Sequence, residues 1–277
     1  LGEGYKRQES VVRSMIAHLR ESEGYSDSRG VYSARTAVAN YYQTKGLDVD
    51  VDQVLLGNGV SELISIVLQA MLDTDDEVLI PAPDYPLWTA QTTLCGGRAV
   101  HYLCDESNGW NPDPHDIESR ITERTRAIVL INPNNPTGAV YEAQVVRQVV
   151  ELARAHGLIV LADEIYEKII YRGQHTYAAE EAGEDVLCLT FSGLSKAYRA
   201  CGFRAGWMVV TGPLGKADDL REGIQLLANM RMCANVPAQH AIQTCLGGYQ
   251  SIDDLVAPGG RFHEQIELAA SMLNEIE

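Results

Sequence analysis

The residues best suited to chemistry stand where short apolar runs end. Residues 158–163 (LIVLAD) end in Asp163 and lead to Tyr166, and residues 187–192 (LCLTFS) lead to Lys196. If these runs are parallel strands, their carboxyl ends meet at one edge of a sheet, which is where open α/β sheets bind ligands. We therefore expect a carboxylate, a phenol and an amine to share one cleft.

A second polar segment, GNGVSE, follows the apolar run that begins at Val54 and opens a helical pattern. Gly59, Val60 and Ser61 would present unpaired backbone N–H groups and a hydroxyl, which is what a bound phosphate requires. The alternative is that Ser61 only caps the helix. The sequence contains no GxGxxG loop after a strand and no GxxxxGK[ST] motif, so dinucleotide and nucleoside triphosphate sites lack their usual loops.

Lys196 is the candidate nucleophile. A buried lysine in a pocket at a strand edge can lose its charge and capture a carbonyl group, and we expect this amine to be buried. The alternative is an ordinary surface lysine. Ser192, Ser195 and Arg204 stand close by in the sequence and add hydroxyls and a second cation that could hold an anion, although Arg204 could equally be a structural ion-pair partner.

Asp163 requires a cationic partner in the cleft. A carboxylate at the end of an apolar run is costly to bury alone, so a cation or a protonated ring nitrogen should meet it. Pyridoxal phosphate has such a ring. Its aldehyde needs a lysine, its phosphate needs a helix N-terminus and an arginine, and its flat face needs an aromatic side chain. The residue types gathered at this edge therefore fit that cofactor.

The elements that must position these residues follow from the periodicity of the apolar residues. Seven short runs rich in β-branched or aliphatic residues predict buried strands, and longer segments with three- and four-residue spacing predict helices between them. The strand runs begin at Val54, Glu77, Arg98, Ala127, Leu158, Leu187 and Trp207. The clearest helical segments are residues 60–72, 85–95 and 142–156. Alternation of this kind predicts the α/β class, with three layers and a mostly parallel seven-stranded sheet.

The two ends of the chain have a different pattern. Helical spacing in residues 11–19 and 33–45 surrounds a GYSDSRG loop, and no strand precedes it. We expect an incomplete helical segment in residues 1–45, a large cofactor-binding domain in residues 46–250, and the start of a C-terminal helix or small domain in residues 251–277. The last run stops without a glycine cap or a basic last turn, so we expect a chain truncated at the small domain.

Composition excludes several classes of partner. The 277 residues include 38 acidic and 22 basic side chains, for a net charge of −16, which repels nucleic acid and anionic membranes. No apolar stretch is long enough to span a bilayer, and no signal peptide is recognisable, so we expect a cytoplasmic protein. The cysteines form no C-x-x-C pair, which predicts reduced thiols and no metal site. They are Cys95, Cys104, Cys188, Cys201, Cys233 and Cys245.

The chain resembles the pyridoxal phosphate-dependent aminotransferases of the aspartate aminotransferase fold type, classes I and II. The resemblance covers nearly the whole sequence and rests on motifs in the family's order: GYSDSRGVYSAR, GNGVSEL, PAPDYPLW, NPNNPTG, ADEIYEKI and FSGLSKAYRACGFRAGW. The stretches INPNNPTGAVY and MRMCANVPAQHAIQTCLGGYQSI are similar to bacterial glutamate–pyruvate (alanine) aminotransferases. The resemblance therefore implies amino-group transfer between an L-amino acid and a 2-oxo acid, with alanine and 2-oxoglutarate giving pyruvate and glutamate.

The resemblance also implies roles around the pyridine ring. Lys196 would form the internal aldimine and then, as a free amine, move a proton from the substrate Cα to the cofactor C4′. Asp163 would pair with the ring nitrogen and keep it protonated. Asn135 and Tyr166 would hydrogen-bond the ring O3′, and Tyr85 would stack on the ring face. From the residues alone, Asn135 and Tyr85 would suggest only a turn or core residue.

For the phosphate, the resemblance implies the start of the helix at Gly59, Val60 and Ser61, together with Arg204. Tyr25 would reach the phosphate of a neighbouring subunit, which implies a homodimer. One position departs from the family pattern: Gly193 replaces a phosphate-binding serine, and Ser192 or Ser195 would compensate.

The family's substrate-gripping parts are not identifiable in this sequence. These parts are an N-terminal glycine segment that closes over the substrate and a small-domain arginine that binds the substrate α-carboxylate. Arg231 and Arg261 lie in helix-like stretches, and we expect both to be solvated and not to face the substrate.

Three other functions stay open at this point. A C–S lyase would use the same cofactor for elimination, and would release ammonia and pyruvate where a transaminase forms glutamate. A catalytically silent fragment would fold, dimerise and bind cofactor without a half-reaction. A nucleotide-binding α/β module would need a glycine-rich phosphate loop, which the sequence does not contain.

Overall fold

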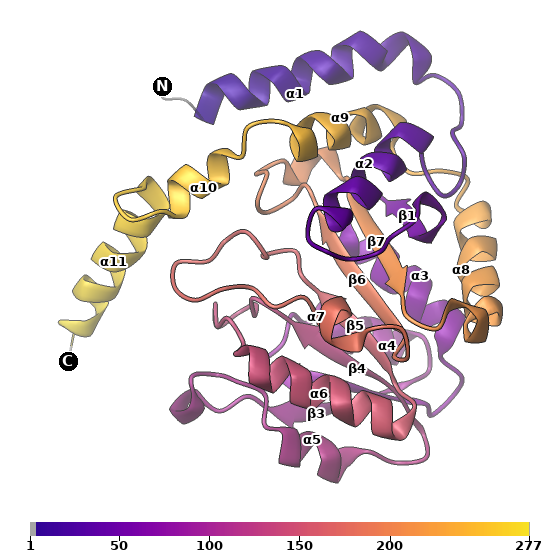
Figure 1. Cartoon of the computed structure of the whole chain (residues 1–277), viewed down its shortest axis with the longest axis vertical. Helices are drawn as coiled ribbons and strands as arrows, with labels where there is room; N and C mark the ends of the chain where they lie inside the picture. Colours follow the sequence, from indigo (N-terminus) through magenta and orange to yellow (C-terminus); the bar gives the residue numbers. More distant parts are fainter. Residues whose placement is uncertain (1–3, 277) are drawn as a thin grey trace.

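One seven-stranded sheet runs through the centre of the chain (Figure 1). The computed structural model describes residues 4–276, with side chains from residue 9 onward. The strand order across the sheet is β1-β7-β6-β5-β4-β2-β3. The strands are β1 (Val54–Gly57), β2 (Glu77–Ala82), β3 (Arg98–Leu103), β4 (Thr125–Ile131), β5 (Ile159–Asp163), β6 (Cys188–Gly193) and β7 (Gly206–Thr211). Each of the seven expected strands is therefore present, within a residue or two of its expected start.

The sheet is parallel except for β7, which runs antiparallel to both β1 and β6. Parallel neighbours need a crossover long enough to hold a helix. The link from β6 to β7 contains only the single-turn η4 (Cys201–Phe203), so β7 returns alongside β6 in the opposite direction. As a result β7 begins at the edge of the sheet where the other strands end. The expected mostly parallel α/β sheet is confirmed.

Helices cover both faces of the sheet, which gives three layers. One core joins the sheet to α3, α4 and α8, and the other joins it to α2, α5, α6, α7 and α9. Their bounds are α2 (Tyr32–Gln43), α3 (Val60–Met71), α4 (Leu87–Leu94), α5 (Pro114–Arg120), α6 (Ala143–His156), α7 (Ala178–Ala182), α8 (Asp218–Met230) and α9 (Val236–Gly247). In β5, Val160 faces one core and its neighbour Leu161 faces the other, because successive strand side chains point to opposite faces.

The helix α6 shows why these segments form helices. Val146, Val149, Val150 and Ala153 recur at three- and four-residue spacing and are buried against the sheet. The helix ends at Gly157, whose φ of 65° is the left-handed conformation that glycine adopts readily at a helix end. The short helices α5 and α7 were not expected from the sequence, since segments of seven and five residues carry little periodic signal.

The outermost helices lie at the ends of the described chain. The helix α1 (Gly4–His18) packs on α9, as does α2, while α10 (Ser251–Val256) and α11 (Arg261–Asn274) extend away from the sheet (Figure 1). Among residues 4–276 no helix has both the length and the apolar character needed to cross a bilayer. The six cysteines are free, and the described residues contain no cluster of metal-ligating side chains.

Replacing Leu161 by alanine tests the doubly covered sheet. Leu161 is fully buried, so Leu161→Ala should lower the free energy of unfolding by about 2–5 kcal/mol, measured by urea denaturation. Leu94→Ala is the control, because Leu94 is 77% exposed and its loss should change stability by less than about 0.5 kcal/mol. Equal effects of the two substitutions would contradict the placement of β5 in the centre of the sheet.

Candidate active site

The candidate residues gather at the carboxyl edge of the sheet. The loops after β1, β2, β4, β5 and β6 begin there, and the segment before β7 ends there, because β7 is the antiparallel strand. These segments carry Ser61, Tyr85, Asn135, Tyr166, Lys196 and Arg204. The antiparallel return of β7 is what brings Arg204 to the same edge as Lys196, although the two residues flank different strands.

Asp163 is the buried charge of the site. It is only 3% exposed, and its carboxylate accepts hydrogen bonds from Trp88 Nε1 at 3.3 Å and from the backbone N–H of Ile165 at 3.4 Å. Burial raises the pKa of Asp163 to about 6, against the opposing effect of these two donors and of the nearby Lys196 ammonium. The carboxylate is therefore incompletely compensated within the chain, and a cationic group placed against it would be stabilised.

Lys196 and Tyr166 lie next to each other. The Lys196 Nζ stands 5.6 Å from the centre of the Tyr166 ring, in the geometry of a cation–π contact. The Lys196 side chain is exposed, so the expectation of a buried amine is wrong for the chain as described. The physical reason is its position: Lys196 lies in a bend three residues after β6 ends, and Gly193 and Leu194 before it are still buried.

The start of α3 and Arg204 lie together at the place predicted to bind a phosphate. Gly59 is the N-cap residue, with a φ of 87°, and no side chain caps the helix. The alternative that Ser61 only caps the helix is therefore wrong, since Ser61 is the second residue of α3 and Gly59 is the N-cap. Arg204 Nη2 donates to the carbonyl oxygen of Asn58 at 3.1 Å, and a Cβ atom at Gly59 would collide with the Arg204 guanidinium. The guanidinium of Arg204 therefore lies beside the uncapped backbone N–H groups at the start of α3.

Glycines let the strands approach this anion site closely. A Cβ atom at Gly206, the first residue of β7, would lie 2.8 Å from the backbone of Gly59 and Val60. A Cβ atom at Gly193 would lie 2.8 Å from the carbonyl oxygen of Ala205, so the packing of β6 on β7 has no room for a serine side chain at position 193. The departure from the family pattern at Gly193 therefore coincides with a close approach of β6 and the segment before β7.

The two serines near Lys196 differ in their surroundings. Ser192 is buried in β6 opposite Trp207, and Ser195 is half-buried beyond the end of the strand. Their roles toward a phosphate stay predictions.

Hydrogen bonds to Tyr141 hold the loop that carries Asn135. Asn134 Nδ2 donates to the Tyr141 hydroxyl at 3.0 Å, and the Tyr141 backbone N–H donates to Asn132 Oδ1 at 2.9 Å. Asn135 itself is half-buried, and together with Tyr166 it lines a cavity of about 660 Å³ between this loop and α11. Asn135 and Tyr166 therefore face one space, which Asp163 and Lys196 do not line. Their roles toward the ring hydroxyl stay predictions.

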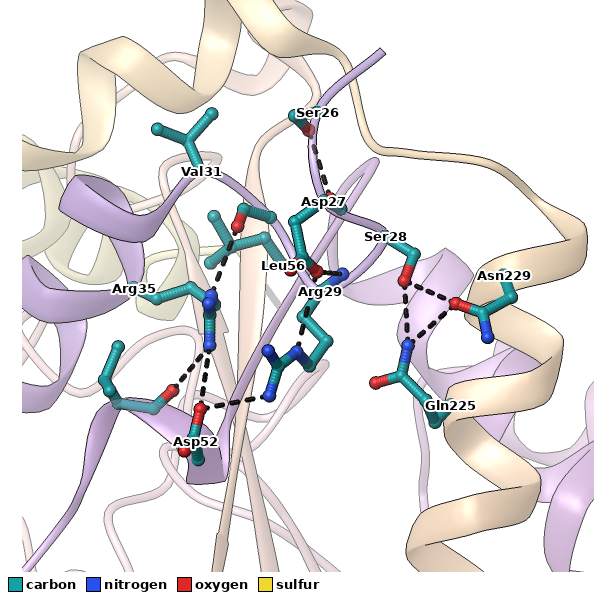
Figure 2. Close-up of polar contacts among 12 residues, drawn as sticks. Ser26, Asp27, Ser28, Arg29, Val31, Arg35, Asp52, Leu56, Gln225 and Asn229 are labelled. Atoms are coloured by element: carbon teal, nitrogen blue, oxygen red, sulfur yellow. Dashed lines mark hydrogen bonds and ion pairs between the residues drawn. The ribbon is translucent and has the colours of Figure 1, made fainter.

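Two aromatic candidates occupy contrasting environments. Tyr85 is half-buried at the turn before α4 and packs against the core on that face of the sheet. Tyr25 is 78% exposed, in the loop between α1 and α2. The residues after Tyr25 are well anchored: Ser28 bonds to Asn229 on α8, and Arg29 pairs with Asp52 at 3.0 Å (Figure 2). Tyr25 thus projects from a fixed loop into solvent.

The two arginines that were expected to be solvated differ. Arg261 is exposed at the start of α11, which confirms the expectation. Arg231 contradicts it, because its side chain is only 13% exposed and its Nη1 lies 2.6 Å from Glu62 Oε2. The reason is tertiary, since the end of α8 packs beside the start of α3.

Sequence reasoning missed Trp88, Glu62 and Arg231. Trp88 carried a usable signal: an indole in a buried helix needs an acceptor for its N–H, and Asp163 is the acceptor. Glu62 and Arg231 are 169 residues apart in the sequence, and no local pattern could have paired them.

Comparisons with a family model and with curated relatives point to the same family of proteins. Residues 5–276 match the family described as aminotransferase class I and II. The alanine aminotransferase of Mycobacterium tuberculosis is 58% identical over 99% of this chain, and the glutamate-pyruvate aminotransferase AlaA of Escherichia coli is 53% identical over 99%. The chain spans 64% and 68% of the lengths of these two relatives.

Solved structures support the same fold. An Escherichia coli aminotransferase superposes with a TM-score of 0.95 at 55% identity, covering 97% of this chain and 67% of that one. The alanine aminotransferase of Pyrococcus furiosus gives a TM-score of 0.91 at 34% identity, covering 97% of this chain and 68% of that one.

The raised pKa of Asp163 predicts how stability depends on pH when no cofactor is present. Because this carboxyl is harder to ionise in the folded chain than in the unfolded chain, its ionisation costs stability as the pH rises from about 4 through about 6. Asp163→Asn, which keeps an acceptor for Trp88, should therefore stabilise the cofactor-free protein by roughly 2–3 kcal/mol near pH 8 and much less at about pH 4. Urea unfolding at both pH values measures this difference, and a stability gain that does not depend on pH would contradict it.

Proposed function

The chain belongs to the class I and II aminotransferases, and we propose that the protein moves an amino group between an L-amino acid and a 2-oxo acid. The proposed reaction converts alanine and 2-oxoglutarate to pyruvate and glutamate. The observation that carries the proposal is the convergence of a buried carboxylate, a lysine and an arginine-flanked helix start at one edge of the sheet. The names of the two curated relatives support the choice of alanine and glutamate as the substrate pair.

The residues at this edge fit pyridoxal 5′-phosphate, the cofactor of the family. The incompletely compensated carboxylate of Asp163 would face the ring nitrogen. The uncapped start of α3 and the guanidinium of Arg204 would hold the phosphate. Lys196 would bind the aldehyde carbon, since its amine is accessible and lies beside the ring of Tyr166. These are the positions that the chemistry of the cofactor requires.

Three more residues would orient the ring. Asn135 and Tyr166 line one cavity and would donate hydrogen bonds to the ring hydroxyl oxygen. Tyr85, fixed against the core at the start of α4, would pack on the ring face. Each comes from a different loop at the carboxyl edge, so the sheet fixes their relative positions.

The chain's own groups have separable tasks in the reaction. The cofactor, when bound, supplies an electron-withdrawing ring that makes the Cα proton of the amino acid acidic. Lys196 Nζ would take that proton from the substrate Cα as a base and return it to the cofactor C4′, two bonds away. Asp163 would keep a proton on the ring nitrogen through a charge-assisted hydrogen bond. Arg204 and the N–H groups at Gly59, Val60 and Ser61 would bind the phosphate and so orient the whole group.

A homodimer is part of the proposal. Tyr25 is 78% exposed on an anchored loop, and a side chain in this position is free to reach the phosphate of a partner subunit. We also propose a cytoplasmic location, because six free cysteines suit a reducing compartment.

The role of Lys196 is tested by substitution in the full-length protein. Lys196→Ala should lower kcat by about 10³-fold or more, because it removes both the anchoring amine and the base. Borohydride treatment followed by peptide mass analysis should label Lys196 in the wild type. Lys216→Ala is the control, since Lys216 is exposed beyond the opposite end of β7. Normal turnover by Lys196→Ala would refute the assignment.

The reaction type is tested by product analysis. With alanine and 2-oxoglutarate, the full-length protein should form glutamate and pyruvate in equal amounts. Cystathionine should release little ammonia or pyruvate. Ammonia and pyruvate from cystathionine, without glutamate from the first pair, would show a C–S lyase. Uptake of cofactor with no half-reaction on either substrate would show a catalytically silent protein.

A further inference from the structure

An ion pair lies directly behind the anion site. Glu62 is in the first turn of α3, and Arg231 follows the last turn of α8. The Arg231 Nη1 and the Glu62 Oε2 are 2.6 Å apart, and the two side chains are 13% and 23% exposed. Neither residue has a role in the function proposed above. A short and largely buried pair at this place holds the backbone around it, because each charge depends on the other for compensation.

Glu62 fixes the peptide that holds Arg204. Its Oε2 accepts from the backbone N–H of Asn58 at 2.8 Å, and its Oε1 accepts from Asn58 Nδ2 at 2.9 Å. The carbonyl oxygen of Asn58 in turn accepts from Arg204 Nη2 at 3.1 Å. The orientation of Asn58 therefore decides where the guanidinium of Arg204 lies against Gly59.

Asn235 also holds Asn58 and the backbone next to Arg204. Its backbone N–H donates to Asn58 Oδ1 at 2.8 Å, and its Nδ2 donates to the carbonyl oxygen of Phe203 at 3.2 Å. Phe203 is the residue before Arg204. Asn235 thus holds both the side chain of Asn58 and the backbone next to Arg204.

Arg231 also reaches the loop that carries Tyr25. Its Nη2 donates to the carbonyl oxygens of Ser28 at 2.7 Å and Leu56 at 3.3 Å. The Ser28 hydroxyl donates to Asn229 Oδ1 at 2.6 Å on α8, close to Arg231 (Figure 2). The guanidinium therefore connects the start of α3, the end of β1 and the segment just after Tyr25.

The charges of the pair matter as much as its hydrogen bonds. Glu62 lies in the same first turn of α3 as Ser61, where the phosphate would bind, and two nearby anions repel each other. Arg231 neutralises Glu62, whose Oε2 accepts from both Arg231 Nη1 and the Asn58 backbone N–H. Without Arg231, the carboxylate would occupy the favourable field of the helix N-terminus in competition with the phosphate.

We propose that Glu62 and Arg231 are positioning residues for the phosphate of the cofactor. The pair acts through Asn58 on Arg204, and through Ser28 on the loop that carries Tyr25. It touches no cofactor atom itself. The inference rests on the proposed function, because the anion it serves is the phosphate of pyridoxal 5′-phosphate.

The proposal predicts a loss that is specific to the phosphate. In the full-length protein, Glu62→Gln should weaken the binding of pyridoxal 5′-phosphate about tenfold. Arg231→Met should weaken it about a hundredfold, because this substitution leaves an unpaired carboxylate beside the anion. Pyridoxal, which lacks the phosphate, should bind each variant within about twofold of the wild type. Absorbance titration of both ligands measures the four dissociation constants.

Two controls separate positioning from general stability. Arg147→Met breaks the exposed Arg147–Glu181 pair on the far side of the sheet and should leave both dissociation constants unchanged. If Arg231→Met does not fold, Arg231→Lys replaces it. Lysine keeps the charge but cannot bond Glu62, Ser28 and Leu56 together, so we expect a loss between those of Glu62→Gln and the wild type.

Several outcomes would overturn the proposal. Equal weakening of the binding of pyridoxal and of its phosphate would show a merely structural pair. A larger loss of affinity for Glu62→Gln than for Arg231→Met would contradict the charge argument.

Binding of inorganic phosphate, followed by phosphorus NMR, tests the pair without Lys196. If phosphate binding falls in both variants while the wild type forms no borohydride adduct, the pair stands and the proposed function fails. If the wild type binds no phosphate, there is no anion site to position and the inference fails.

Discussion

The candidate site depends on the buried carboxylate of Asp163. This group is 3% exposed, and burial raises its pKa to about 6 even though Trp88 and the Ile165 backbone both donate to it. A carboxyl group held in this way costs the folded chain stability whenever it is ionised, and a cation placed against it removes the cost. The chain therefore keeps a locally unfavourable charge at the edge of its sheet, and the protonated ring nitrogen of the proposed cofactor would stabilise it. Such local cost is typical of functional sites and is offset by the packing of the two cores elsewhere.

The sheet topology gathers the remaining groups around that carboxylate. Parallel strands deliver Tyr166 and Lys196 to one edge, and the single antiparallel strand β7 delivers Arg204 to the same edge by beginning there. Gly193 and Gly206 allow β6, β7 and the start of α3 to approach more closely than any side chain would permit. The candidate anion site therefore depends on the close approach of these backbone segments as much as on charged side chains. The Glu62–Arg231 pair then fixes this arrangement from behind, through Asn58.

Much of this was predictable from the sequence, for identifiable reasons. The strands carry continuous apolar runs because both faces are covered, and the groups at their ends are adjacent to those runs in the chain, so Asp163, Tyr166 and Lys196 could be placed at one edge from local pattern alone. Tertiary contacts were not predictable. Arg231 was expected to be solvated, yet it pairs with Glu62 across 169 residues, and the donor role of Trp88 depends on how α4 packs against β5. The exposure of Lys196 also differed from expectation, because exposure depends on what covers the bend after β6.

In the proposed function, Asp163 is ionised and holds a proton on the ring nitrogen of the cofactor. Nitrogen NMR of the full-length protein, loaded with pyridoxal 5′-phosphate that is isotope-labelled at the ring nitrogen, reads this proton directly. We expect a protonated ring nitrogen in the wild type throughout the neutral and mildly alkaline range, and a deprotonated one in Asp163→Asn. A ring nitrogen that is unprotonated in the wild type at neutral pH, or equally protonated in both proteins, would contradict the account.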